Sequence, residues 1–276
     1  MPSDADRTRQ YYDALGEREW TRLTDSVAGR VAFEVHRRFL ARFVRAGDRV
    51  LEIGAGPGRF TLELAALGAR IVVTDLSPVQ LELNRRHVGP TDAERRVEQR
   101  IECDVRDTAG FGDGAFDAVV AFGGPLSYAF EEAEQAVRGL LRVVGPRGVV
   151  LASVMSTLGT WRQALPSVTG VAERVGDEVN DAVLADGDLR LIDRTEHACR
   201  MFRWRQLRDL VEQAGGRVVA ASASNWASLG DPSVLEPLER DPDRWRHFLD
   251  NEVGACAEPG ALDGGTHLIF AATSAA

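Results

Sequence analysis

Short runs of apolar residues alternate with amphipathic segments along the first half of the chain. Five runs between residues 49 and 155 are rich in valine and isoleucine, as buried strands are: RVLEI, RIVVTD, VEQRIECD, FDAVVAFG and GVVLASVM. The segments between them carry apolar residues at helical spacing, as Phe60, Leu64 and Leu67 do after the first run. Strands that alternate with helices predict an α/β fold in which helices cover both faces of a parallel sheet.

The second half of the chain follows a different pattern. Residues 156–200 hold two weaker helical patterns and no clear strand. An amphipathic helix and two further strand-like runs, RVVAASAS and THLIFAAT, come later, separated by the helical pattern of residues 226–265. We therefore predict a Rossmann-like, doubly wound sheet of seven strands, mostly parallel with an antiparallel last strand, that carries helical cap insertions.

These elements predict a single domain over residues 1–276. Its parts are an N-terminal helical lid at 7–46, ended by Gly47, a ligand-binding core at 47–155, a cap insertion at 156–200, and a C-terminal part of the core at 201–276 that contains the helical insertion 226–265. Connections in α/β domains are usually short, so both insertions are expected to serve function.

Composition and charge narrow the classes of partner. Hydrophobic residues make up 44% of the chain, which is enough for a full core. The net charge of −9 disfavours nucleic acid, because cationic side chains supply most non-specific affinity for phosphate. Three widely spaced cysteines do not form a disulfide framework, and no apolar run has the length of a membrane span. The N-terminus lacks the apolar core of a signal peptide, so we expect a cytoplasmic protein without a membrane partner.

The loop after the first strand carries three glycines, in the stretch VLEIGAGPGRF. The dinucleotide-binding fingerprint requires its third glycine at position 59, where this chain has Arg59. Pro57 also removes a backbone donor that a phosphate would use. The loop therefore favours S-adenosylmethionine, which has no phosphate, over a dinucleotide.

Carboxylates stand at the ends of the first three strands. Glu52 precedes the glycine loop, Asp75 ends the second strand, and Asp104 ends the third. Ligands of open α/β sheets bind at the carboxyl ends of the strands. An acid at the end of the second strand can accept hydrogen bonds from both hydroxyls of a ribose.

These motifs, in this order, resemble those of the class I S-adenosylmethionine-dependent methyltransferases. VLEIGAGPGRF resembles their glycine-rich motif, VVTDLSP their acidic ribose motif, IECDVRD their adenine motif and FDAVVAFGGPL their fourth-strand motif. The resemblance is close over residues 45–155 and looser over 200–225 and 265–273. It implies methyl transfer from S-adenosylmethionine, with S-adenosylhomocysteine as the product, to an acceptor that we expect to be a small molecule.

The resemblance also implies roles for single residues. Glu52 would orient the ammonium group of the cofactor, Asp75 would bind the ribose, and Asp104 would accept from the adenine amino group. The residues implied to contact the cofactor are Glu52, Gly54, Ala55, Gly56, Gly58, Asp75, Leu76, Asp104, Val105, Phe122 and Tyr12.

The acceptor site is less defined by the sequence. His197 and Tyr128 are the candidate catalytic residues, since histidine is the usual base at physiological pH. The candidate substrate-binding residues, taken from the ends of the two insertions, are Arg200, Asn225 and Trp226. Pairs such as Cys199 with His197 lack the spacing of a zinc site, so we predict no metal.

Three alternatives remain open at this point. They are an NAD(P)-dependent oxidoreductase on a similar sheet, a non-catalytic regulatory protein that binds S-adenosylmethionine, and a methyltransferase that acts on RNA or protein. The acceptor atom and the oligomeric state are also open.

Overall fold

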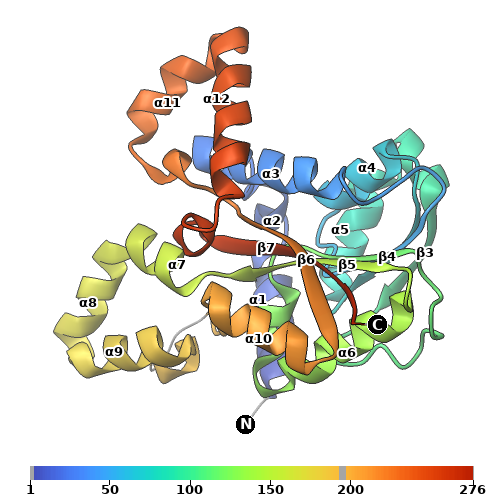
Figure 1. The fold of residues 1–276 in the computed structure, drawn as a ribbon, viewed down its shortest axis with the longest axis horizontal. Coiled ribbons are helices and arrows are strands. Elements are labelled where there is room, and N and C mark those ends of the chain that lie inside the picture. The colour runs from blue at the N-terminus through green and yellow to red at the C-terminus, as the bar shows by residue number, and fades with distance from the viewer. Residues whose placement is uncertain (1–2, 193–196, 276) are drawn as a thin grey trace.

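The computed structural model describes residues 3–192 and 197–275, and within them seven strands form one mixed sheet (Figure 1). The strands are β1 (Arg49–Ile53), β2 (Arg70–Asp75), β3 (Val97–Glu102), β4 (Ala118–Ala121), β5 (Val149–Met155), β6 (Gly216–Ala223) and β7 (His267–Ser274). Their order is β3-β2-β1-β4-β5-β7-β6. Neighbouring strands are parallel except at β7, which runs antiparallel to both β5 and β6. The predicted sheet is confirmed.

Twelve α-helices surround the sheet within the described residues. They are α1 (Asp4–Leu15), α2 (Arg18–Thr21), α3 (Val27–Leu40), α4 (Arg59–Ala66), α5 (Pro78–Val88), α6 (Ala133–Val144), α7 (Thr157–Gln163), α8 (Leu165–Val175), α9 (Asp177–Asp186), α10 (Trp204–Gln213), α11 (Pro232–Glu239) and α12 (Pro242–Cys256). Short 3₁₀ turns connect several of them. No helix among these residues is long and apolar enough to cross a membrane.

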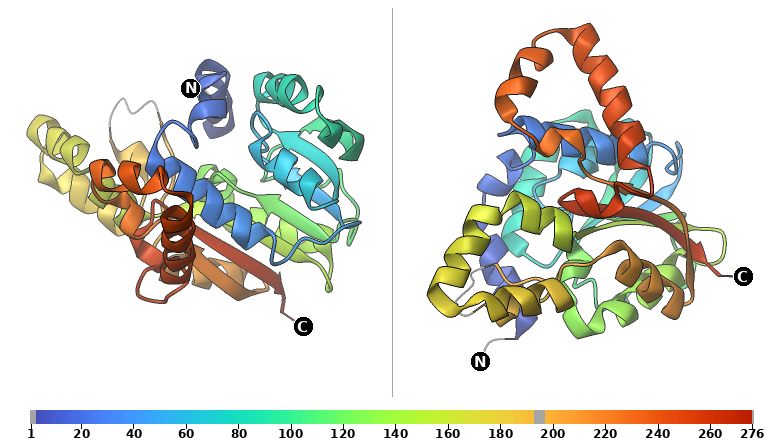
Figure 2. Two further views of the ribbon diagram at one scale, coloured as in Figure 1. Left: turned by 90° about the horizontal axis from the view of Figure 1, so that it is seen from above. Right: turned by 60° about the vertical axis from the view of Figure 1, so that its left-hand side comes forward.

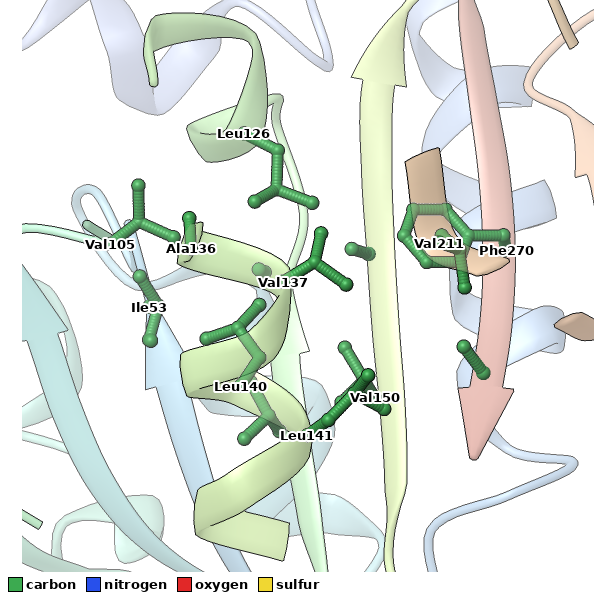
Figure 3. Packing of buried hydrophobic residues seen from close by; sticks show 14 of the residues in the cluster. Ile53, Val105, Leu126, Ala136, Val137, Leu140, Leu141, Val150, Val211 and Phe270 are labelled. Carbon is green, nitrogen blue, oxygen red and sulfur yellow. The ribbon is translucent and has the colours of Figure 1, made fainter. Parts of the chain in front are cut away.

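Two apolar cores form, one on each face of the sheet. On one face, α6 packs against β4 and β5 and α10 packs against β6, and Val137, Leu140 and Phe270 belong to the core there (Figure 3). On the other face, α3 places Val31, Val35 and other buried residues against the strands. Strands buried on both faces read as continuous apolar runs, which explains the pattern of the sequence.

The N-terminal segment differs from the single helical stretch predicted over residues 7–46. It forms three helices, because Gly16 adopts a positive φ of 53° at the end of α1 and Ser26 caps a new helix. The side chain of Ser26 accepts a hydrogen bond from the Gly29 amide, and α3 ends at Leu40. The breaks allow α1 and α3 to pack against different parts of the core.

Both insertions are helical, as their patterns predict. The first contains α7, α8 and α9, which extend from the sheet on one side, and the second contains α11 and α12, which project on another (Figures 1 and 2). Helices α11 and α12 pack against each other and against α3. The second insertion is therefore tied to the N-terminal segment, which also approaches the sheet's carboxyl edge.

Candidate active site

A cavity lies at the carboxyl ends of β1, β2, β3 and β4, and we call it the strand-end cavity. It contains about 890 Å³ of empty space, including its open mouth. Its walls include Gly54, Ala55, Gly56, Asp75, Leu76, Asp104, Val105, Phe122, Tyr12 and Tyr128. The structure thus brings together most of the residues that the motifs singled out.

The three glycines of the loop are required for different structural reasons. Gly54 has a φ of 67°, and a Cβ there would lie 2.6 Å from Pro125 Cγ. Gly56 lines the cavity, and the nearest atom to a Cβ there would be Glu19 Cγ at 3.8 Å. Gly58 precedes α4, and its Cβ would lie 2.7 Å from Val88 Cγ2, so it permits helix packing and does not line the cavity.

Asp75 holds the loop from the end of β2. One carboxylate oxygen accepts from the Gly56 amide at 2.8 Å, and the other accepts from the Ser77 amide at 2.8 Å. Burial raises the pKa of Asp75 to about 6. The carboxylate is therefore fixed in position at the cavity wall, where its remaining lone pairs can accept further hydrogen bonds.

Asp104 is also fixed, by a residue that the sequence did not point to. Arg106 donates to both oxygens of the Asp104 carboxylate, with Nε 2.9 Å from Oδ1, and its own amide also donates to Oδ1. A further bond joins Arg106 Nη1 to Glu132 at 3.1 Å. Arg106 lines the strand-end cavity beside Asp104, so the two form a charged pair on its wall.

Glu52 lies in β1 beneath the loop and is not on the cavity wall. Its side chain is buried, and Oε2 accepts from the Thr61 hydroxyl at 2.7 Å. Its other oxygen, Oε1, has no hydrogen-bond partner among the described residues. Burial raises the pKa of Glu52 to about 8. Glu52 therefore carries a proton at neutral pH.

Replacing Glu52 with glutamine is expected to stabilise the ligand-free protein above about pH 8. The unfolded chain ionises Glu52 near its ordinary pKa of 4.5, whereas the folded protein keeps the proton up to about pH 8. The wild type therefore loses free energy of unfolding as the pH rises between these values, by a few kcal/mol in total, and Glu52→Gln does not. Thermal melts of both proteins should coincide near pH 5 and separate progressively as the pH rises to about 8, with the difference retained at alkaline pH. Equal melting temperatures at alkaline pH would contradict the raised pKa.

Helix α1 closes one side of the strand-end cavity with Ala5, Thr8 and Tyr12. It is held on α5, because Gln80 Nε2 donates to the Tyr12 carbonyl at 2.9 Å and the Ser77 hydroxyl donates to Asp13 at 2.5 Å. The sequence predicted a lid in this segment, and α1 covers the cavity as such a lid would.

A second cavity adjoins the first, and we call it the histidine chamber. It contains about 1120 Å³ of empty space, including its mouth. His36, His197, His267 and Asn225 are among its lining residues. The two cavities share four lining residues, namely Arg22, Leu23, Phe60 and Gly123. No local motif in the sequence marks His36, His267 or Arg22 as residues of a site.

The two candidate catalytic residues belong to a chain of hydrogen bonds between the cavities. The Tyr12 hydroxyl lies 2.7 Å from the Tyr128 hydroxyl, which lies 2.6 Å from His197 Nε2. Tyr11 stacks on the His197 ring, with 4.7 Å between the ring centroids. Tyr128 lines the strand-end cavity and His197 lines the histidine chamber, so the chain joins the lid to both spaces.

The three candidate substrate residues lie in different surroundings, and only Asn225 lines one of the two cavities. Asn225 lines the histidine chamber, where its amide donates to the Ala28 carbonyl at 3.0 Å. Arg200 lines neither cavity, because its guanidinium lies over the Phe202 ring. The amides of Trp226 and Ala227 donate to Glu252, which fixes the backbone turn at this point. The indole of Trp226 therefore packs on Gly264 and is 40% exposed.

Metal ligands are not grouped in either cavity. Among residues 3–192 and 197–275, no three histidine, cysteine, aspartate or glutamate side chains are arranged to hold a metal ion.

The core of the chain is similar in sequence to known methyltransferases. Residues 50–148 match the model of a family described as "Methyltransferase domain". A demethylmenaquinone methyltransferase of Clavibacter sepedonicus is 37% identical over 115 residues, which cover 41% of this chain and 43% of that protein. A magnesium-protoporphyrin O-methyltransferase of Rhodobacter capsulatus is 32% identical over 143 residues, or 46% of this chain and 62% of the relative. The chain thus spans about half the length of these curated relatives.

A solved structure extends the similarity of fold to nearly the whole chain. The [4+2]-cyclase SpnF superposes with a TM-score of 0.64 at 18% sequence identity, over 99% of this chain and 97% of that one. At this level of identity the similarity concerns the fold alone. The helical insertions and the sheet therefore belong to one known arrangement.

Proposed function

We propose that this chain transfers the methyl group of S-adenosylmethionine to a small-molecule acceptor, because residues 50–148 match a family of methyltransferase domains. The observation that carries the proposal is the pair of adjoining cavities, since the strand-end cavity has the features of a cofactor site and the histidine chamber lies next to it. The transfer would take place at the four residues that the cavities share.

The strand-end cavity has features that fit S-adenosylmethionine. Gly56 has no side chain to occupy the cavity. Asp75 has a fixed carboxylate at the point where a ribose would lie. When bound, the cofactor would supply an electrophilic methyl group on a sulfonium.

The residues of the chain would then position the reactants and exclude water. Asp104, held by Arg106, would accept from the adenine amino group, and Leu76 and Val105 would flank the ring. Helix α1 would cover the cofactor through Thr8 and Tyr12. Alignment of the acceptor atom with the methyl group supplies most of the rate in such a displacement.

A small molecule is the acceptor class that the site favours. The histidine chamber is a cavity of the size that ligand pockets usually have, and its walls combine apolar residues with polar side chains that include three histidines and Asn225. Two curated relatives carry the names of small-molecule methyltransferases. The net charge of −9 also disfavours RNA.

Calorimetric titration with S-adenosylmethionine, S-adenosylhomocysteine and NAD tests this proposal. We expect the first two to bind and NAD not to bind. The variant Gly54→Ala should bind S-adenosylmethionine at least about tenfold more weakly, because of its positive φ and the contact with Pro125. Gly112→Ala is the matched control, since nothing lies within 4 Å of the added Cβ.

Two results would contradict the proposal. Binding of NAD without S-adenosylmethionine would favour an oxidoreductase. Tight binding of S-adenosylmethionine with no transfer of a labelled methyl group to any small acceptor would favour a regulatory protein.

A further inference from the structure

His36 and His267 face the histidine chamber, and the methyl transfer proposed above gives neither of them a role. We propose that this chamber binds a neutral, largely apolar molecule with a weakly acidic hydroxyl group, such as a phenol or an enol, and that His36 Nε2 accepts the hydroxyl proton during methyl transfer. The inference rests on the proposed function, because it names the acceptor of that same reaction.

The hydrogen bonds of His36 fix its tautomer. His36 lies in α3, and its Nδ1 is 2.8 Å from the Ala32 carbonyl oxygen. A carbonyl oxygen only accepts, so Nδ1 carries the ring proton and Nε2 carries the lone pair. No residue in the described part of the chain hydrogen-bonds Nε2. The ring lines the chamber and therefore offers one acceptor to a ligand there.

His36 also lies beside the passage between the two cavities. Its ring centroid is 5.0 Å from that of Phe122, which lines the strand-end cavity. It is 5.7 Å from the ring of Phe60, which lines both. An acceptor hydroxyl at this passage would reach His36 and a methyl group from the neighbouring cavity together.

The charges around the chamber select a neutral acceptor. The described residues that line it include no aspartate or glutamate, so a cation would find no counter-charge. The chamber's one arginine, Arg22, is paired with Glu19 through two bonds of 2.7 Å, so it is not available to an anion without losing this pair. A neutral molecule that donates a hydrogen bond needs no counter-charge and leaves the pair of Arg22 and Glu19 intact.

His36 and His267 are neutral at physiological pH. Burial, with Arg22 as a smaller cause, lowers the pKa of His36 to about 4. Burial, with His36, Arg22 and His197 nearby, lowers the pKa of His267 to about 3. His36 therefore keeps its lone pair available through the neutral pH range.

The step conserves atoms and charge. The hydroxyl oxygen forms a bond to the methyl carbon as the carbon–sulfur bond breaks, and that electron pair stays on sulfur. The hydroxyl proton moves to His36 Nε2 and afterwards to solvent. The positive charge disappears from sulfur as it appears on the imidazole, so the charge buried in the site stays constant. Loss of the sulfonium charge also raises the proton affinity of His36 as the transfer proceeds.

Matched hydroxyl and thiol acceptors test the role of His36. We would measure formation of S-adenosylhomocysteine at saturating S-adenosylmethionine with phenol, catechol and thiophenol as probes, because a thiolate reacts without a base. His36→Gln should lower kcat with the hydroxyl probes about 100-fold or more, and with thiophenol by less than about threefold. His247→Gln, on the exposed face of α12, is the matched control and should change neither.

Each contrary outcome overturns a stated part of the inference. Equal losses with hydroxyl and thiol probes would show that His36 is only structural. A selective loss in His197→Gln, and none in His36→Gln, would make His197 the base. A wild type that binds S-adenosylmethionine but methylates none of the hydroxyl probes would overturn the acceptor class. Failure to bind S-adenosylmethionine at all would be seen by calorimetry, and would overturn the proposed function and this inference with it.

Discussion

Asp75→Ala is expected to weaken binding of S-adenosylmethionine about 100-fold, which corresponds to about 3 kcal/mol. The wild-type carboxylate is buried at the end of β2 and held by the Gly56 and Ser77 amides. Its loss would remove charge-assisted hydrogen bonds to the ribose and would also release the glycine loop. Calorimetry on the purified variant measures the change in affinity.

Folding must be separated from binding in this experiment. Burial raises the pKa of Asp75, so the ionised carboxylate destabilises the ligand-free protein at neutral pH, and its removal offsets part of the cost of the lost loop bonds. We therefore expect a folded variant. Asp107→Ala, at an exposed aspartate outside the strand-end cavity, is the matched control and should bind normally. A folded Asp75→Ala with unchanged affinity would refute the ribose assignment.

Glu252→Ala is expected to lower the free energy of unfolding by about 3–5 kcal/mol, or roughly 10 °C in melting temperature. Glu252 lies in α12 and is buried, and its carboxylate accepts from the amides of Trp226, Ala227 and Ser228 at 2.8–3.0 Å. It also accepts from the Ser228 hydroxyl at 2.6 Å. Removing it would leave these donors buried without partners. Urea unfolding followed by circular dichroism measures the loss.

The same helix supplies the comparison for Glu252. Asp250 makes an exposed ion pair with Arg38, and Asp250→Ala should cost less than about 1 kcal/mol. Glu252→Gln should lower the free energy of unfolding by an amount between those of Asp250→Ala and Glu252→Ala. Its amide oxygen still accepts a hydrogen bond, whereas its NH₂ group faces a backbone donor. A Glu252→Ala variant as stable as Asp250→Ala would show that the turn finds other partners. In that case the position of Asn225, which Ser228 holds at 2.9 Å, would not depend on Glu252.

The cofactor side of the site could be predicted because its signals are local. Gly54, Gly56 and Asp75 follow directly after strands, and a parallel sheet brings the ends of its strands to one edge. The strands could be predicted from local signals as well, since a strand that is buried on both faces appears in the sequence as a continuous apolar run. The division of the N-terminal segment into separate helices also has a sequence signal, since Gly16 can end a helix and Ser26 can cap the next one. The helical spacing of the apolar residues in this segment concealed that signal.

The acceptor side could not be predicted because its residues meet only in the fold. His36 lies in α3 and His267 begins β7, and they come together because β7 inserts between β5 and β6 at the sheet's edge. The place of Trp226 also depends on the fold, because the backbone turn that Glu252 binds directs the indole onto Gly264.

The position of α1 has a consequence for the kinetics of the proposed reaction. Ala5, Thr8 and Tyr12 of this helix line the strand-end cavity, whereas none of them lines the histidine chamber. The two ligands would therefore exchange by separate routes, and only the cofactor would need α1 to move. Such an arrangement favours an ordered sequence in which S-adenosylmethionine enters first, the acceptor comes and goes while α1 stays closed, and S-adenosylhomocysteine leaves last. Opening of this helix at Gly16 would then govern the exchange of the cofactor and not the exchange of the acceptor.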